Sequence, residues 1–317
     1  MPRNDLLRGG LATLALATAL PAWAETTHET YRLTFGAFEG DGTGGAFDFD
    51  QSGGEAEAEW RIGRLLLGTG LEVLRYDESS AYTIGTEVYA TAGYRITPRL
   101  TAGTTLISYD LRTSGAFDPA PRTRVGAFAE YRGGAFDAVL YAETDPDVSG
   151  DDYIYLGSRY APNGGNWSLA GSIAVYPDDS AAENTLRVTY TAEDWQATAF
   201  YYTFDASAGS DQTELGVYGR YDPSRLDRLR LYGGLRTGGF DGADDWRGLS
   251  LGVGYEVMPD GHLILGYDLR DARSVDYSER GITIGFEMDL GARGLLHQEM
   301  FTADSDDIRR TGGEWYD

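Results

Sequence analysis

The sequence predicts an all-β protein, a transmembrane antiparallel β-barrel of about sixteen strands. Three observations support this. Segments of about ten residues alternate apolar and polar side chains, short turns alternate with longer acidic loops, and the chain begins with an export signal. Beyond residue 20 no stretch has the length and apolarity of a membrane-spanning helix. An exported chain that enters lipid must then cross it as a closed barrel, because hydrocarbon offers no partner to backbone polar groups.

The N-terminus has the pattern of a signal peptide. Two arginines precede an apolar run over residues 9–20, and the small-residue pattern A-x-A follows at 22–24. The run is shorter than the ~20 residues of a helical span, which disfavours the alternative of a retained anchor. We expect cleavage of the bond between Ala24 and Glu25, which removes residues 1–24.

The amino-acid composition excludes several kinds of function and site. The formal net charge is −24, every basic side chain that is not histidine is an arginine, and there is no cysteine. These features exclude disulfides and thiolate metal sites, and they make nucleic-acid binding by counterion release an unsuitable function. The 43 glycines and 22 tyrosines suit a barrel wall, where glycine permits bends and tyrosine suits the membrane interface.

The alternation has a period of two, as in a strand with one apolar face. Within 82–96 the apolar positions fall on one face, and Thr83, Glu87, Tyr89, Thr91 and Arg95 fall on the other. The pattern recurs along the chain and predicts sixteen strands within a barrel over residues 25–290: 29–38, 55–62, 65–76, 81–96, 99–111, 123–132, 135–143, 152–161, 166–176, 184–192, 195–204, 212–221, 228–237, 246–257, 261–269 and 279–290. Counts of fourteen or eighteen remain open, because the turn near Gly63 is inferred mainly from parity.

The connections fall into two alternating sets. Short turns are predicted around 97–99, 133–134, 162–165, 193–194, 222–224 and 259–261, and longer acidic loops at 112–123, 144–152, 177–183, 205–211, 237–245 and 270–278. Bacterial membrane barrels place tight turns in the periplasm and longer loops outside the cell. An even strand count then places both ends of the barrel on the periplasmic side.

The last predicted strand supports the same assignment. The segment 283–290, polar-x-Gly-x-x-apolar-x-apolar, resembles the C-terminal recognition strand of outer-membrane barrels. It departs from that pattern because it ends on Leu290 rather than an aromatic residue and because residues 291–317 follow it. We expect this tail to be periplasmic or folded into the lumen.

In length, export signal, even strand count and acidic loops, the mature chain resembles the Gram-negative bacterial outer-membrane porins. The resemblance implies a passive diffusion channel for ions and small hydrophilic solutes in the outer membrane of a Gram-negative bacterium. It also implies contacts with outer-membrane lipid and lipopolysaccharide, and insertion by the barrel assembly machinery through the last strand. General porins are trimers with a long third loop folded into the pore. The longest loop expected here is only 39–54, so a monomer fits as well as a homotrimer.

The polar face of the strands supplies the candidate pore lining. Two sets of opposite charge are expected to face inward: Arg95, Arg132, Arg187, Arg220, Arg228, Arg230 and Arg236, with Glu87, Glu130, Glu214, Glu256, Asp268 and Glu287. Charged side chains in a pore tune ion selectivity. The alternative is that they form cross-strand ion pairs that serve the wall alone. The two roles are compatible.

A weak cation motif lies in one loop. Asp145, Asp147 and Asp151 have the spacing that opens a calcium loop, but the twelfth position is Leu156 rather than glutamate and no helix flanks the segment. We expect no cofactor, apart from Ca²⁺ or Mg²⁺ held loosely on acidic loops. An acidic, solvated loop is the simpler interpretation.

Enzyme chemistry has little support. The only histidines are His28, His262 and His297, and none lies in a recognisable catalytic pattern. The alternative to a channel is a structural or surface-interaction barrel with a plugged lumen. Aromatic residues at strand ends are expected to form interface girdles: Trp60, Trp167, Trp195, Trp246, Tyr94, Tyr160 and Tyr221.

Overall fold

A computed structural model describes residues 28–41, 49–78, 81–114, 120–146, 152–177, 181–205, 211–224, 226, 228–240, 246–259, 261–272 and 277–289, with only the backbone described at 28–51, 287–289 and a few isolated positions. These residues form sixteen strands: β1 (His28–Asp41), β2 (Phe49–Ile62), β3 (Leu65–Glu78), β4 (Ala81–Arg95), β5 (Leu100–Thr113), β6 (Arg122–Arg132), β7 (Phe136–Thr144), β8 (Tyr153–Tyr160), β9 (Trp167–Tyr176), β10 (Ala181–Thr191), β11 (Trp195–Asp205), β12 (Gln212–Tyr221), β13 (Leu229–Phe240), β14 (Trp246–Met258), β15 (Gly261–Ala272) and β16 (Tyr277–Asp289). Within the described residues there is no helix long and apolar enough to cross a membrane.

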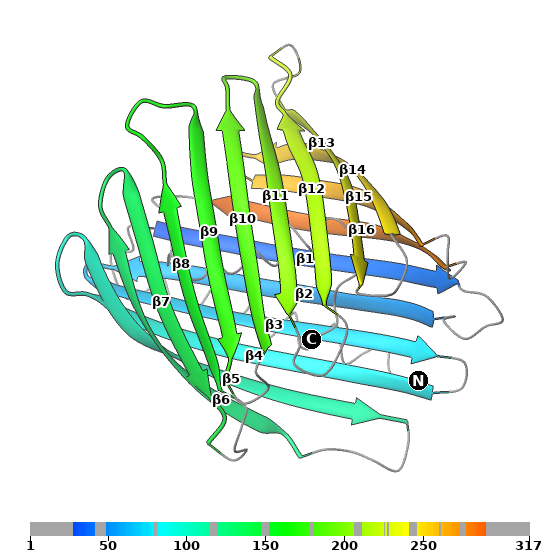
Figure 1. Cartoon of the computed structure of the whole chain (residues 1–317), viewed down its shortest axis with the longest axis horizontal. Coiled ribbons are helices and arrows are strands. Elements are labelled where there is room, and N and C mark those ends of the chain that lie inside the picture. The colour runs from blue at the N-terminus through cyan, green and yellow to red at the C-terminus, as the bar shows by residue number, and fades with distance from the viewer. Residues whose placement is uncertain are drawn as a thin grey trace.

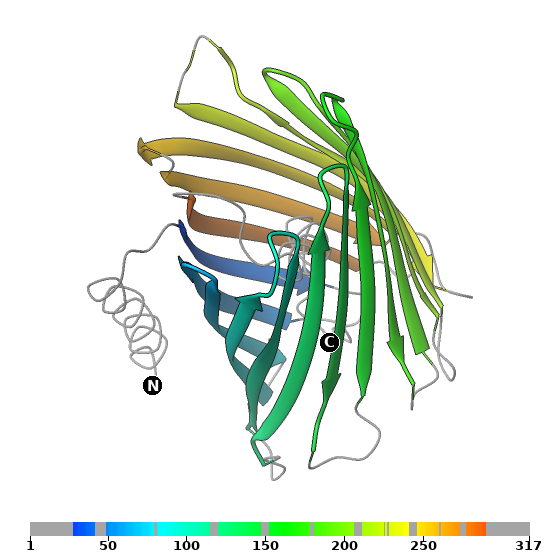
Figure 2. The same cartoon turned by 90° about the vertical axis from the view of Figure 1, so that its left-hand side faces the viewer.

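The strands form one closed antiparallel barrel. Each strand pairs with its neighbours in the chain, and β1 pairs with β16 from Thr30 opposite Asp289 to Asp41 opposite Ser278. In Figure 1 the near wall, β7–β12, runs across the direction of the far wall, β1–β4 and β14–β16. Figure 2 shows the same strands following one another around the ring. Opposite walls cross in this way because barrel strands tilt by roughly 35–45° from the axis.

The predicted number of strands is confirmed, and so is the turn near Gly63, whose φ is 62°. Several strands are longer than predicted. β2 begins at Phe49 rather than 55, β13 ends at Phe240 rather than 237, and β15 ends at Ala272 rather than 269. The prediction underestimated them because glycine and charged residues at these ends pair through the backbone, which side-chain alternation does not report. The first connection is therefore 42–48, not 39–54.

The two ends of the barrel carry different connections. We call the end with the connections 42–48, 114–121 and 145–152 the loop side, and the other end, with the turns at 63–64 and 133–135, the turn side. β1 starts and β16 ends on the turn side. The eight loop-side connections hold thirteen acidic residues and one arginine, whereas the seven turn-side connections hold five acidic residues and four arginines.

The two faces of the sheet differ in polarity and in exposure. On one face, large apolar side chains are open to the surroundings, such as Val88 at 45%, Leu106 at 51% and Leu235 at 66% exposed. On the other face, charged side chains are enclosed, such as Glu130 at 3% and Glu214 at 1%. Because the sheet closes on itself, the enclosed face is the inner face. The apolar face therefore points outward, which alternation alone could not decide.

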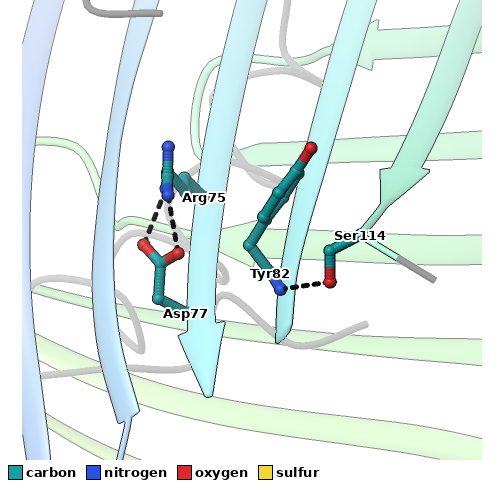
Figure 3. Close-up of polar contacts among 4 residues, drawn as sticks. All are labelled: Arg75, Asp77, Tyr82 and Ser114. Carbon is teal, nitrogen blue, oxygen red and sulfur yellow. Dashed lines mark hydrogen bonds and ion pairs between the residues drawn. The ribbon is translucent and has the colours of Figure 1, made fainter. Parts of the chain in front are cut away.

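At the loop-side end of β3–β5 the outer face becomes polar. The Arg75 guanidinium donates two hydrogen bonds to the Asp77 carboxylate, at 2.6 and 2.7 Å, and lies 5.2 Å from the Tyr82 ring centroid. The Tyr82 backbone N–H donates to Ser114 Oγ at 2.9 Å (Figure 3). Because ion pairs on the outer face are unsuited to hydrocarbon, this level marks the loop-side boundary of the apolar belt.

Glycines on the inner face make room for large side chains from the next strand. A methyl group at Gly238 would lie 2.6 Å from Trp246 Cζ2, and one at Gly248 would lie 2.6 Å from Arg236 Nε. A methyl group at Gly216 would clash with the Phe200 ring. The large side chains therefore lie along the wall over neighbouring glycines instead of extending across the lumen.

Candidate functional site in the barrel lumen

The inner wall contains most of the predicted lining residues. Eleven of the thirteen lie in strands with their side chains described: Arg95, Arg132, Arg187, Arg220, Arg230, Arg236, Glu87, Glu130, Glu214, Glu256 and Asp268. Their strand positions alternate with exposed apolar residues, which places them on the inner face. Whether solutes contact them stays a prediction.

The other two predicted lining residues differ. Arg228 lies in the turn before β13, where it is exposed and its carbonyl accepts a hydrogen bond from the Glu256 N–H at 2.8 Å. It therefore lies at the rim of the barrel rather than on the wall. Glu287 lies in β16 opposite His262, but its side chain is outside the described residues.

A continuous line of inner residues crosses the wall from β6 to β16. Successive pairings join Arg132, Asp137, Arg159, Ala170, Arg187, Phe200, Gly216, Arg236, Gly248, Arg270 and Glu279. We call this line the arginine row, since five of its eleven positions are arginine. Because the strands are tilted, the row runs obliquely along the barrel axis, from the turn-side end of β6 to the loop-side end of β16. It therefore places positive side chains along the length of the lumen.

Ion pairs hold several inner arginines against the wall, and one of them, Arg159, belongs to the arginine row. Arg159 Nη2 lies 2.6 Å from Asp137 Oδ2, and Arg124 Nη1 lies 3.2 Å from Glu143 Oε1. Near the turn side, Asp222 lies between Arg220 Nε at 3.2 Å and Arg230 Nε at 3.5 Å. The cross-strand interpretation of the charges therefore fits Arg159–Asp137 and Arg124–Glu143, whereas Asp222 lies in the turn between β12 and β13. It leaves a role in permeation open, because their side chains are 25–39% exposed except for Asp137 and Glu143.

The most enclosed charges gather around Trp246 near the loop side. Arg236 Nη1 lies 3.5 Å from Glu214 Oε1, and their side chains are 1% and 0% exposed. The guanidinium carbons of Arg236 and Arg270 lie 4.9 and 4.1 Å from the Trp246 ring centroid. Trp246 itself is 1% exposed and faces inward. Its predicted place in an interface girdle is therefore wrong, because the indole lies over Gly238 on the inner face, beside two cations.

Aromatic residues cover the inner face of β6–β9. Phe128, Tyr141 and Tyr155 pack with Leu66, Val139 and Ala174, all buried. The ring centroid of Tyr153 lies 6.1 Å from that of Tyr141 and 5.2 Å from that of Tyr176. The Tyr141 hydroxyl donates to Glu143, and the Tyr176 hydroxyl donates to Glu183 at 2.9 Å. Tyrosine hydroxyls and carboxylates thus form a mixed polar and aromatic lining on this part of the wall.

Sequence reasoning missed part of this lining. Asp137, Glu143, Arg159, Arg270 and Glu279 all lie on the inner face, yet none was singled out. The charges follow the same period of two as the predicted set, so a stricter count along 136–144 and 261–272 would have found three of them. The tyrosines could not be assigned in this way, because tyrosine suits a lipid interface as well as a wet lumen.

The predicted girdle is visible at the turn-side ends of the outer face. Tyr94, Tyr160, Trp167, Trp195 and Tyr221 are 51, 44, 45, 45 and 46% exposed. Rings pair across strands, with centroids 5.7 Å apart for Tyr160 and Trp167. Trp60 differs because it is 3% exposed and packs with Ala58 and Leu67.

The predicted calcium-type loop, cleavage site and C-terminal tail lie partly or wholly outside the described residues. Of the calcium-type loop, Asp145 is 2% exposed at the end of β7, while Asp147 and Asp151 lie outside the described residues. Among the described residues there is no group of three histidine, cysteine or carboxylate side chains arranged to hold a metal. The cleavage site at Ala24 and Glu25 and the tail 291–317 also lie outside the described residues.

The fold is shared with solved membrane channels. No family model matches the sequence, and no curated protein matches it. The Pseudomonas aeruginosa proteins OpdO and OpdQ each superpose with a TM-score of 0.54 at 11% identity, over 84% of this chain and 98% of theirs. CymD, described as a monoaromatic hydrocarbon channel, superposes with a TM-score of 0.53 at 11% identity, over 90% of this chain and 94% of its own. At these identities the similarity establishes a porin-like barrel fold.

Proposed function

We propose that the protein is an outer-membrane porin, a passive diffusion channel for ions and small hydrophilic solutes. The observation that carries the proposal is the closed sixteen-strand barrel with an apolar, exposed outer face and a charged inner face. A ring of about sixteen strands leaves an aqueous channel, whereas an eight-strand ring is filled by its own side chains. The named channels with the same fold support the proposal.

The arginine row is suited to this role because it offers a solute successive charged partners along the lumen. Charged lining residues favour permeation when each contact is weak enough to be exchanged for the next. The apolar belt and the turn-side girdle support a location in outer-membrane lipid, with the turn side in the periplasm. Contacts with lipopolysaccharide, insertion by the barrel assembly machinery, the choice between monomer and homotrimer, and Ca²⁺ or Mg²⁺ on the acidic loops belong to the same proposal.

The second candidate is a structural barrel with a closed lumen. It is favoured by the nearly complete enclosure of Glu214, Arg236 and Trp246, whose inward side chains have little access to solvent. The two candidates differ in one measurable quantity, the ion current through a single molecule.

The test is single-channel recording in a planar bilayer with purified, folded protein of residues 25–317. A porin gives discrete current steps of reproducible size, one for each insertion. The control is the same preparation unfolded by heat in detergent, which removes the barrel. Folded protein that inserts into vesicles but gives no current above background would overturn the channel and support the closed barrel.

A further inference from the structure

The turn-side end of β2–β6 carries a concentration of arginine in an otherwise acidic protein. Arg61, Arg95 and Arg132 end β2, β4 and β6 near this rim, and Arg64 and Arg99 lie in the adjoining turns. We call these five residues the arginine rim. The backbone brings them together, since the Arg95 N–H donates to the Arg64 carbonyl and the Arg132 N–H to the Arg99 carbonyl, both at 2.8 Å.

Three members of the rim face the lumen. Arg61 is the cross-strand partner of the inner residue Leu66, and Arg132 is the partner of the inner residue Asp137. Arg95 is paired with Thr101, which is itself paired with the inner residue Glu130, so Arg95 lies on the inner face too. Arg64 and Arg99 are exposed in the turns. On the same strands the nearest inner carboxylates are Glu59 and Glu130. Five cations against two anions leave the β2–β6 part of this mouth positive, whereas the turn-side connections as a whole hold nearly equal numbers of both signs.

The opposite mouth is negative. The loop-side connections carry thirteen acidic residues against one arginine. Inner carboxylates add to them near this end, including Glu143 at the end of β7 and Glu279 in β16. The fixed charge therefore differs along the axis, with strongly acidic connections at the loop side and a basic patch at the arginine rim.

We propose that this axial charge separation makes the pore rectify, so that it conducts better when the loop side is the positive electrode. This inference rests on the proposed channel function. With the loop side positive, cations enter through the acidic mouth and anions enter through the arginine rim. The arginine rim repels the cations before they leave, and the acidic mouth repels the anions. Both kinds of ion therefore accumulate in the lumen, and the conductance rises. With the polarity reversed, each ion leaves faster than it is replaced, and the lumen is depleted.

The effect must depend on salt. At 0.1 M salt the Debye length is about 10 Å, which is comparable with a pore radius, whereas at 1 M it is about 3 Å. The charges at the mouths therefore control the ion content of the lumen at low salt and are screened at high salt. We expect a ratio of currents at opposite voltages of about two at 0.1 M KCl and close to one at 1 M.

The experiment compares currents at plus and minus 100 mV for the wild type and two rim variants. R64Q/R99Q removes two exposed side chains while keeping the backbone hydrogen bonds, and should lower the ratio. R61Q/R95Q/R132Q removes the inward charges and should bring the ratio near one. A D211C variant, in a chain without cysteine, identifies the loop side by its reaction with an impermeant thiol reagent added to one chamber.

The matched control is R75Q/R112Q. It removes two arginines from the outer face near the loop side, where they pair with Asp77 and Asp110, and should leave the ratio unchanged. A linear current–voltage relation in the conducting wild type would overturn the rectification alone. Rectification that survives in both rim variants would overturn its assignment to the arginine rim. Absence of any current from folded protein would overturn the channel, and the rectification with it.

Discussion

At the scale of single residues, the inner glycines determine how close the large side chains lie to the wall. The Phe200 ring lies over Gly216 of the neighbouring strand, and the pairing of these two residues fixes the overlap. Since an added methyl group has no room there, the ring would have to move toward the lumen. Glycine at such positions preserves an open lumen as well as a packed wall.

We therefore expect G216A to destabilise the barrel by about 1–3 kcal/mol, the usual cost of overpacking. The matched control is G171A, where the added methyl group would lie 3.5 Å from the Thr185 carbonyl and 3.8 Å from Leu186 Cδ1, in ordinary contact. The free energy of unfolding, from urea titration in lipid vesicles, measures both. Equal stability of the two variants would contradict the role assigned to the glycine.

The buried pair Arg236–Glu214 gives a second prediction at this scale. Their side chains are 1% and 0% exposed, so removal of either leaves a charge in a poorly solvated place. We expect E214A and R236A each to cost about 3–5 kcal/mol. The double variant should cost clearly less than their sum, because it leaves neither charge alone. Additive costs in the same urea titration would show that the two groups are independent.

The sequence predicted single positions well where polarity alternates without ambiguity. Arg95, Glu130 and Asp268 were placed on the polar face because each lies between a tyrosine and an aliphatic residue on the opposite face. Trp246 was misplaced, since an indole suits a girdle by its chemistry and only the neighbouring Gly238 and two arginines show why it faces inward. Pairing across strands decides such cases, and a single sequence does not contain it.

At the scale of elements, register explains which strand features were predictable. Strand number and order follow from period-two alternation and turn residues, and Gly63 and Gly134 take the positive φ that their turns require. Strand ends were less predictable, because glycine and aspartate near 39–54 and 237–245 mask the alternation although the backbone still pairs. The arginine row follows from ten successive cross-strand pairs between β6 and β16. It could not be derived from the sequence of each strand considered separately.

The two faces of β16 offer a direct test of orientation. Ile284 is 51% exposed on the outer face between Phe35 and Leu265, while Thr283 is on the inner face between Gly36 and Gly266. We expect I284R to destabilise the barrel in vesicles by about 2–4 kcal/mol, as for arginine in the hydrocarbon, and T283R by under about 1 kcal/mol. Gel mobility of unheated samples measures the folded fraction. The opposite order would mean that the polar face contacts lipid.

At the scale of the whole molecule, the connections are too short to shape the lumen. The longest intervals between strands, 114–121 and 145–152, contain eight residues each. General porins narrow their pore with a much longer loop, so the sequence-based doubt about such a constriction agrees with the strand boundaries. Of the wall and the connections between strands, we therefore expect the inner side chains of the wall to narrow the lumen more.

Conductance should therefore respond to the wall and not to the loops. Tyr89 extends over Gly70 and donates from its hydroxyl to Glu57 Oε1 at 2.9 Å, so its ring occupies space on the inner face. We expect Y89A to increase single-channel conductance in 1 M KCl, where charge is screened, and deletion of residues 116–119 to leave it unchanged. Y82F, an outer-face control, should also leave it unchanged. A conductance that rises on loop deletion and not in Y89A would place the constriction in the loops, because a pore that is narrowed by its wall does not widen when a connection is shortened.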